Sequence, residues 1–135
     1  MKTYSFRLKP KEDLKKKLYD FVEVHNIKAG FILTCVGSLE KINIRLSNLK
    51  IFTQIEFYEI TSLVGTLCKD GLHLHIGVSD NTGKAFGGHL LNDCIIHTTA
   101  EIVICIEDDI CYKREYDNVT MFKELKIIKK TEYEI

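Results

Sequence analysis

LHLHIGVSDNTGKAFGGHLL, residues 72–91, contains two alternating apolar segments separated by a cluster of turn-forming residues. Alternation of apolar and polar side chains is typical of half-buried strands, and Asp, Asn and Gly between two such segments favour a hairpin. If the loop consists of residues 81–83, Gly83 occupies the place where a three-residue hairpin needs a left-handed backbone. The stretch therefore predicts two antiparallel strands whose register decides where their polar side chains lie.

The loop length sets which residues of this hairpin face each other. Counting back from an Asp80–Lys84 pair places His75 opposite His89. His73 projects from the same face as His75, because side chains alternate along a strand. A four-residue loop would turn His89 to the other face, and a bulge at the glycine pair before it would also change the register. The three-residue loop predicts that three imidazoles converge.

Converging imidazoles on a rigid strand pair are suitable zinc ligands. We predict that His73, His75 and His89 bind zinc and leave a fourth position for water or a substrate. A zinc-bound water that ionises near neutral pH would permit hydrolytic or lyase chemistry. The alternative is an ordinary polar strand face, which His-x-His sequences often form.

Other residues are candidates for the pocket around such a site. A ligating histidine needs its second ring nitrogen held by a carboxylate or carbonyl group, and Asp93 and Glu101 are candidates for that role. Gly87 and Gly88 lack side chains and leave space beside the strand. His97 shares a predicted strand face with Glu101, an arrangement equally typical of a subunit contact. No nucleophile beside a histidine base is found, so no catalytic residue is assigned and enzymatic activity stays open.

The rest of the chain predicts one helix among many strands. Apolar residues recur at helical spacing over 11–25, with Pro10 suited to the first turn. Further strands are expected over 4–8, 31–36, 42–46, 55–66, 95–106 and 111–116, and residues 122–128 are ambiguous between strand and short helix. This order predicts an α+β domain, a mainly antiparallel sheet with the early helix packed on one face.

Composition indicates a single globular domain over residues 1–135, because no linker or repeat divides the chain. Lysine plus arginine and aspartate plus glutamate both total 19, so the formal net charge is zero. DNA-binding domains usually carry a basic excess. Lys11 and residues 15–17 form either a local basic patch or an ordinary solvated helix face.

Five cysteines without Cys-x-x-Cys spacing argue against a disulfide framework and against a zinc ribbon. The N-terminus has no apolar signal segment, and the apolar runs are too short to cross a bilayer. We therefore expect a soluble, cytoplasmic protein with reduced thiols and no membrane partner.

Five segments carry a family resemblance: Gly37–Leu39, Glu59–Thr66, Leu72–His75, Gly87–Leu91 and Thr98–Ile104. In this order and spacing the chain resembles the plants-and-prokaryotes-conserved (PPC) domain family, in particular its stand-alone prokaryotic members. The resemblance implies a compact domain with a mainly antiparallel sheet, a homotrimer, and a predicted DNA-binding role. It also implies a bound metal, zinc, at His73, His75 and His89.

The chain departs from the plant members of that family, which carry AT-hook motifs and tend to lack these histidines. It has three arginines and no Arg-Gly-Arg core, so the inherited DNA-binding role is weakly supported. Three functions stay open: a DNA-binding or regulatory protein with a zinc site, a metal-dependent enzyme or small-molecule-binding protein, and a purely structural oligomerisation module.

Overall fold

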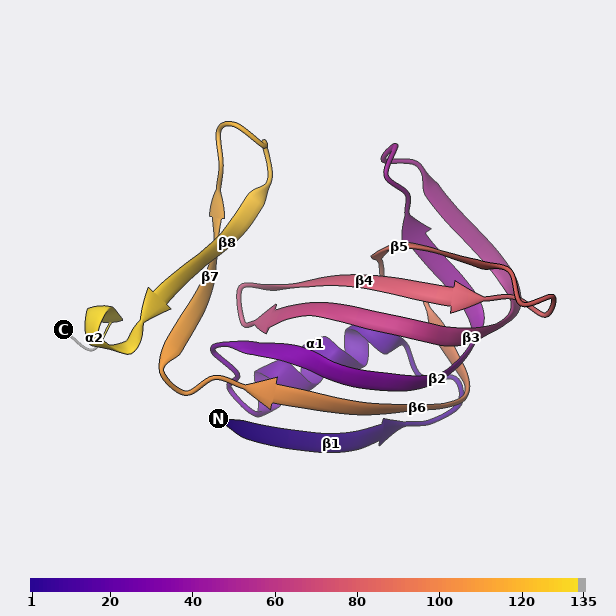
Figure 1. The fold of residues 1–135 in the computed structure, drawn as a ribbon, viewed down its shortest axis with the longest axis horizontal. Coiled ribbons are helices and arrows are strands. Elements are labelled where there is room, and N and C mark those ends of the chain that lie inside the picture. Colours follow the sequence, from indigo (N-terminus) through magenta and orange to yellow (C-terminus); the bar gives the residue numbers. More distant parts are fainter. Residues whose placement is uncertain (134–135) are drawn as a thin grey trace.

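Eight strands and two helices make up most of residues 1–133, the part of the chain that this computed structural model describes. The elements are β1 (Lys2–Leu8), α1 (Leu14–Val24), β2 (Gly30–Arg45), β3 (Ile51–Cys68), β4 (Gly71–Ser79), β5 (Ala85–Leu90), β6 (Ile95–Ile106), β7 (Ile110–Tyr116), β8 (Lys123–Lys129) and α2 (Lys130–Tyr133). The predicted class is confirmed: the chain forms mainly antiparallel sheet with one early helix packed on it (Figure 1).

β2 organises the main sheet because it pairs with three other strands. Six strands are hydrogen-bonded in the order β1-β6-β2-β3-β4-β5, every pair antiparallel. The end of β2 also pairs with β5, at Arg45↔His89. The strands β2, β3, β4 and β5 therefore form a closed ring of paired strands. The two strands expected over 31–36 and 42–46 are in fact one, because register shifts near Leu39 let a single strand bend instead of ending.

The helix α1 begins at Leu14 and not at Lys11. Lys11 has a φ of 74°, outside the helical region, so Pro10 lies in the preceding turn and the expected helical start was wrong. The side chain of Asp13 accepts a hydrogen bond from the backbone N–H of Lys16 and caps the helix. A side-chain cap of this kind satisfies an N–H group that has no partner within the helix, which fixes the start.

One face of α1 supplies the centre of the core. Leu14, Leu18 and Val22 are fully buried, and Phe21 stacks on Phe6 of β1 with ring centroids 4.3 Å apart. Burying each such aliphatic side chain contributes about 1.5–3 kcal/mol, so packing holds the helix against the sheet. Neither helix of the described residues is long and apolar enough to cross a membrane.

The predicted three-residue loop of the histidine hairpin is confirmed. The N–H of Asp80 donates to the carbonyl oxygen of Lys84, and Gly83 has a φ of 84°. A carboxylate oxygen of Asp80 also accepts the N–H of Lys84, which holds the turn. His75 therefore lies opposite His89.

A second, two-stranded sheet forms at the C-terminal end. β7 and β8 pair with each other from Ile110↔Lys129 to Tyr116↔Lys123, so the ambiguous segment 122–128 is a strand. The β7–β8 hairpin stands beside the end of the main sheet where β3 turns into β4 (Figure 1).

The cysteines are small packed side chains, as expected. Cys68, Cys94 and Cys105 are buried, and all five cysteines are free thiols. Burial raises the pKa of Cys35 and of Cys94 to about 11. These two thiols are therefore protonated and poorly nucleophilic at neutral pH.

Replacing Gly37 by alanine should destabilise the sheet, because a Cβ there would lie 2.0 Å from the carbonyl oxygen of Thr99 on β6. We expect the free energy of unfolding in urea to fall by about 1–3 kcal/mol. Thr34→Ala, at an exposed position of the same strand, is the control and should cost less than about 0.5 kcal/mol. Unchanged stability of Gly37→Ala would contradict the close approach of β2 and β6.

Candidate metal centre

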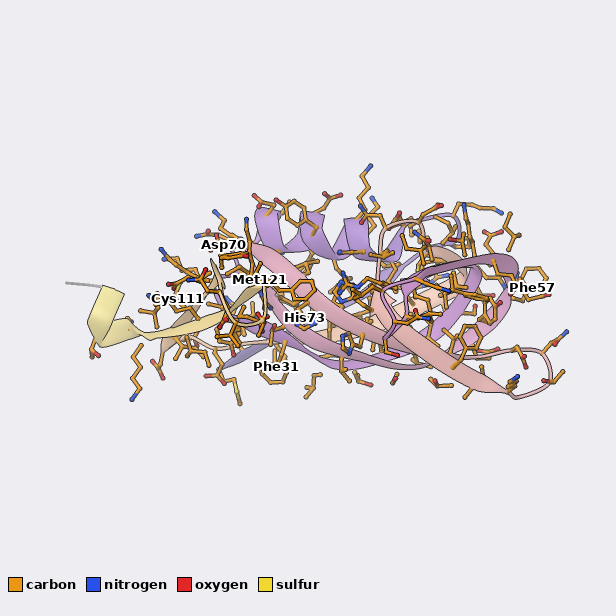
Figure 2. All side chains as sticks on the ribbon, turned by 90° about the horizontal axis from the view of Figure 1, so that it is seen from above. Phe31, Phe57, Asp70, His73, Cys111 and Met121 are labelled. Atoms are coloured by element: carbon orange, nitrogen blue, oxygen red, sulfur yellow. The ribbon has the colours of Figure 1, made fainter. Side chains whose placement is uncertain are left out.

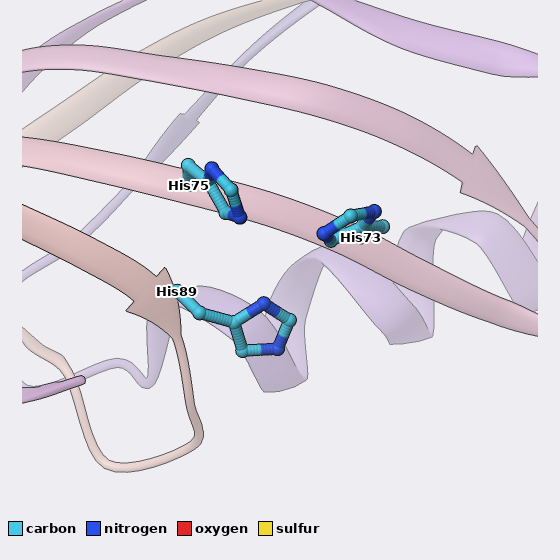
Figure 3. A group of neighbouring side chains, drawn as sticks. All are labelled: His73, His75 and His89. Carbon is cyan, nitrogen blue, oxygen red and sulfur yellow. The ribbon is translucent and has the colours of Figure 1, made fainter. Parts of the chain in front are cut away.

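Three histidines converge on the outer face of β4 and β5. One ring nitrogen from each of His73, His75 and His89 lies within 4.8 Å of the other two. The ring centroids are 5.0, 5.4 and 5.7 Å apart, and Figure 3 shows the rings gathered around a shared space. The predicted convergence is confirmed, and this histidine cluster can hold a metal ion.

Strand alternation places the cluster. Leu74 and Ile76 of β4 are buried in the core. Because side chains alternate along a strand, His73 and His75 project from the opposite, outer face. The antiparallel return of β5 then sets His89 beside His75. The two histidines of β4 are exposed and the third is half-buried, so the donors lie on a rigid strand pair that solvent can reach from one side.

The two glycines before His89 allow neighbouring strands to approach. A Cβ at Gly87 would lie 2.2 Å from the carbonyl oxygen of Ile76, and one at Gly88 would lie 2.6 Å from that of Arg45. The space that glycine leaves is therefore taken by β4 and β2. Both glycines also line an open cavity of about 610 Å³ beside His89.

The surroundings favour the neutral form of two of the rings. Partial burial, followed by the positive charges of Arg45 and Lys15, lowers the pKa of His89 to about 4. Burial and the neighbouring His75 lower the pKa of His73 as well. Neutral imidazole is the form that coordinates a metal, so these two rings need release no proton at pH 7.

An unpaired nitrogen of His89 is a second observation that favours a metal ion at the histidine cluster. The Nδ1 atom of His89 is buried with no hydrogen-bond partner among the described residues. Buried polar atoms are nearly always paired, so this one needs an explanation. A metal ion bound by the lone pair would provide it, and three imidazole nitrogens suit zinc. Tetrahedral donors are roughly 3.4 Å apart, so binding would draw the rings closer together.

The β7–β8 hairpin forms one wall of the site. Arg114 donates from Nη2 to Oγ1 of Thr66 at 2.8 Å, and its backbone N–H donates to Asp70 at 3.2 Å. Thr66 lies opposite His73, so these bonds bring the hairpin to the cluster. An open cavity of about 370 Å³ lies between the hairpin and the histidine cluster. Its lining includes His73, His89, Arg45, Arg114, Phe122, Lys123, Asp70 and Glu124.

Asp93 and Glu101 do not join the cluster. Asp93 forms an ion pair with Lys41 at 2.5 Å. Glu101 on β6 lies opposite Arg7 of β1, and β6 is separated from β4 by two strands. Among the described residues no carboxylate is hydrogen-bonded to the three rings, so the expected orienting groups are absent there.

His97 lies elsewhere too. Its ring stacks on Phe57 of β3 with centroids 4.3 Å apart, and both residues line a different cavity. Figure 2 shows Phe57 at one end of the molecule, well apart from His73 near the middle and from Asp70 beyond it. His97 therefore belongs to a separate surface.

Sequence reasoning missed the other residues that line this site, among them Arg45, Arg114 and Phe122. Nothing local connects them to the histidines, because the closure of β2 onto β5 and the docking of the β7–β8 hairpin bring them there.

Comparison with known proteins places the chain among larger relatives. Two curated proteins, each the bifunctional protein GlmU of a Synechococcus strain, are 41% identical over 133 and 128 residues. The matches cover 98% and 94% of this chain, which spans only about a fifth of the length of those relatives.

Solved structures share the whole fold. A hypothetical protein from Salmonella enterica is 32% identical with a TM-score of 0.93, and the match covers 96% of this chain and 94% of that one. A metal-containing protein from Archaeoglobus fulgidus is 22% identical, with a TM-score of 0.77 and coverage of 93% and 94%. A protein from Bacteroides thetaiotaomicron, provisionally described as DNA-binding, is 24% identical, with a TM-score of 0.81 and coverage of 92% and 91%.

The sequence profile of the Plants and Prokaryotes Conserved domain, abbreviated PCC or PPC, matches residues 1–107. That match covers both strands of the histidine hairpin, so the predicted resemblance is confirmed, and the chain belongs to the PCC domain family.

Proposed function

We propose that this PCC domain binds zinc through His73, His75 and His89 and presents the metal to a small-molecule ligand. The convergence of the three imidazoles beside an open cavity carries the proposal. The A. fulgidus protein of the same fold, which contains a metal, supports it. Zinc is the metal proposed because a set of three nitrogen donors with an open fourth position suits it.

A bound zinc ion would supply a Lewis acid with one exchangeable position. The chain's own residues hold the donors: two histidines on β4 and one on β5 form a triangle that strand pairing keeps rigid. The adjoining cavity, which reaches Arg45 and Phe122, gives a ligand access. The alternative within the same proposal is a metal-dependent enzyme that uses this site. Such an enzyme needs a general base, and none is assigned among the described residues around the cluster.

A regulatory role is supported by the curated relatives. The segment similar to this chain makes up about a fifth of each GlmU protein, so there it accompanies a much longer polypeptide. A domain that binds its own ligand can transmit that binding to an attached or associated partner. We place residues 1–135 in this role as a single domain.

A homotrimer in the cytoplasm is part of the proposal. Leu33 and Val36 of β2 and Val64 of β3 are exposed apolar side chains on the central strands. Apolar side chains grouped on a sheet face favour association with another surface. Free thiols such as Cys68 suit a reducing compartment.

DNA binding is the second candidate function, favoured by the description of the B. thetaiotaomicron protein. Lysines gather near the start of α1, but Lys11 pairs with Glu40 and Lys17 pairs with Glu12. The formal net charge of the whole chain is zero. This surface therefore offers few free cations to DNA phosphates.

Protein purified without a histidine tag should contain about one zinc ion per chain by mass spectrometry of the metal. The His73→Ala/His75→Ala variant keeps only one of the three donors and should contain almost none. His97→Ala, whose ring stacks on Phe57 away from the cluster, is the matched control and should keep the wild-type content. Wild-type protein that neither retains nor takes up zinc would refute the proposed site.

Because Lys11 and Lys17, two of the lysines near the start of α1, are already paired, we expect no mobility shift on duplex DNA at roughly 100 mM salt. A shift that weakens steeply as salt rises and disappears in Lys15→Glu/Lys16→Glu would establish DNA binding as the function instead. Lys50→Glu/Lys84→Glu, at two exposed positions in other turns of the chain, makes the same change in net charge and is the control.

Sedimentation equilibrium should give the mass of three chains. Leu33→Glu adds a charge to the exposed apolar face and should shift the protein toward the monomer. Leu49→Glu, in the turn between β2 and β3, should remain trimeric. The double histidine variant should also stay trimeric. A trimer that never takes up zinc would favour the purely structural module.

A further inference from the structure

Two arginines lie on different sides of the histidine cluster. Arg45 of β2 is paired with His89 of β5, and directly opposite side chains project from the same face of a sheet. Arg114 of β7 reaches Thr66, the residue opposite His73. Both arginines line the cavity of about 370 Å³ beside the cluster.

Neither arginine is neutralised by a carboxylate. Among the described residues, the ion pairs include neither Arg45 nor Arg114. The guanidinium of Arg45 lies 5.8 Å from the ring centroid of Phe122. The guanidinium of Arg114 donates to the hydroxyl of Thr66, and a guanidinium has five N–H donors, so most of its hydrogen-bonding capacity is left.

The charges around the cavity favour an anion. The lining places Arg45, Arg114 and Lys123 against Asp70 and Glu124, so cations outnumber carboxylates three to two. Asp70 already accepts the backbone N–H of Arg114. A divalent metal on the histidines would add two positive charges to this side of the cavity.

We infer that this cavity binds a small organic anion, a carboxylate or a phosphate ester, through Arg45 and Arg114. The inference rests on the proposed function, because the anion would also contact the metal that His73, His75 and His89 would hold. Guanidinium groups match the paired oxygens of carboxylate and phosphate. Phe122 gives the organic part of the ligand an apolar wall.

The C-terminal hairpin adds this selectivity to the family domain. Arg114, Phe122 and Lys123 all lie beyond residues 1–107, the segment that the family profile matches. Within that segment the histidines supply metal binding and Arg45 supplies one cation. The hairpin completes the cavity and makes it specific for an anion with an apolar part.

Calorimetric titration of zinc-loaded full-length chain with inorganic phosphate and with acetate, at constant ionic strength in chloride, tests this inference. We expect one anion per chain, bound in preference to chloride. Arg45→Gln and Arg114→Gln should each weaken binding by about tenfold, with zinc content unchanged. Tighter binding of phosphate would assign a phosphate ester as the ligand, and tighter binding of acetate would assign a carboxylate.

Lys113→Gln is the matched control, because Lys113 is exposed next to Arg114 on the other face of β7. It should bind the anion as the wild type does. Should a glutamine variant lose zinc or unfold, Arg45→Lys and Arg114→Lys replace it. They keep the charge but lose the paired donors, so they must bind the anion more weakly than the wild type with zinc retained.

Three results would overturn the inference. Zinc-loaded protein that takes up neither anion, or whose arginine variants bind it undiminished, rules out the anion site and leaves the zinc site standing. Protein that takes up no zinc removes the proposed function itself, and metal analysis of the same samples separates the two failures.

Discussion

The pairing of β2 with three other strands is the constraint on which the rest of this structure depends. β2 pairs with β3 and β6 along most of its length and with β5 at its end. That last contact closes part of the sheet and sets Arg45 beside His89. The closure brings the backbones of β2 and β5 close together, because a Cβ at Gly88 would lie 2.6 Å from the carbonyl oxygen of Arg45. Glycine at this position is a packing requirement of the site.

The histidine cluster combines donor nitrogens with an excess of nearby cations. Burial and the charge of Arg45 keep His89 neutral, which suits metal coordination. Its Nδ1 is also buried without a hydrogen-bond partner among the described residues. Carboxylates that usually orient ligating histidines are not bonded to these rings in the described part of the chain. Cations outnumber carboxylates three to two in the lining of the cavity, and an external anion would offset this excess and part of the charge of a bound metal.

Local patterns predicted the hairpin well because its register depends on a few consecutive residues. The turn around Gly83 fixes the loop length, and strand alternation then fixes the faces of His73 and His75. The helix start was misplaced because the Asp13 cap outweighs the preference of proline for a first turn. Glu101 was wrongly expected near the cluster, since distance along the chain says nothing about the order of strands in a sheet.

Turn chemistry and alternation, both properties of neighbouring residues, were enough to specify the three histidines and their common face. The tertiary structure alone decided what surrounds them. Arg45 reaches the site through the closure of β2 onto β5, and Arg114 and Phe122 reach it through the docking of the β7–β8 hairpin. These contacts join segments far apart in the chain, so they depend on the free energy of the whole packed fold and leave no local pattern in the sequence.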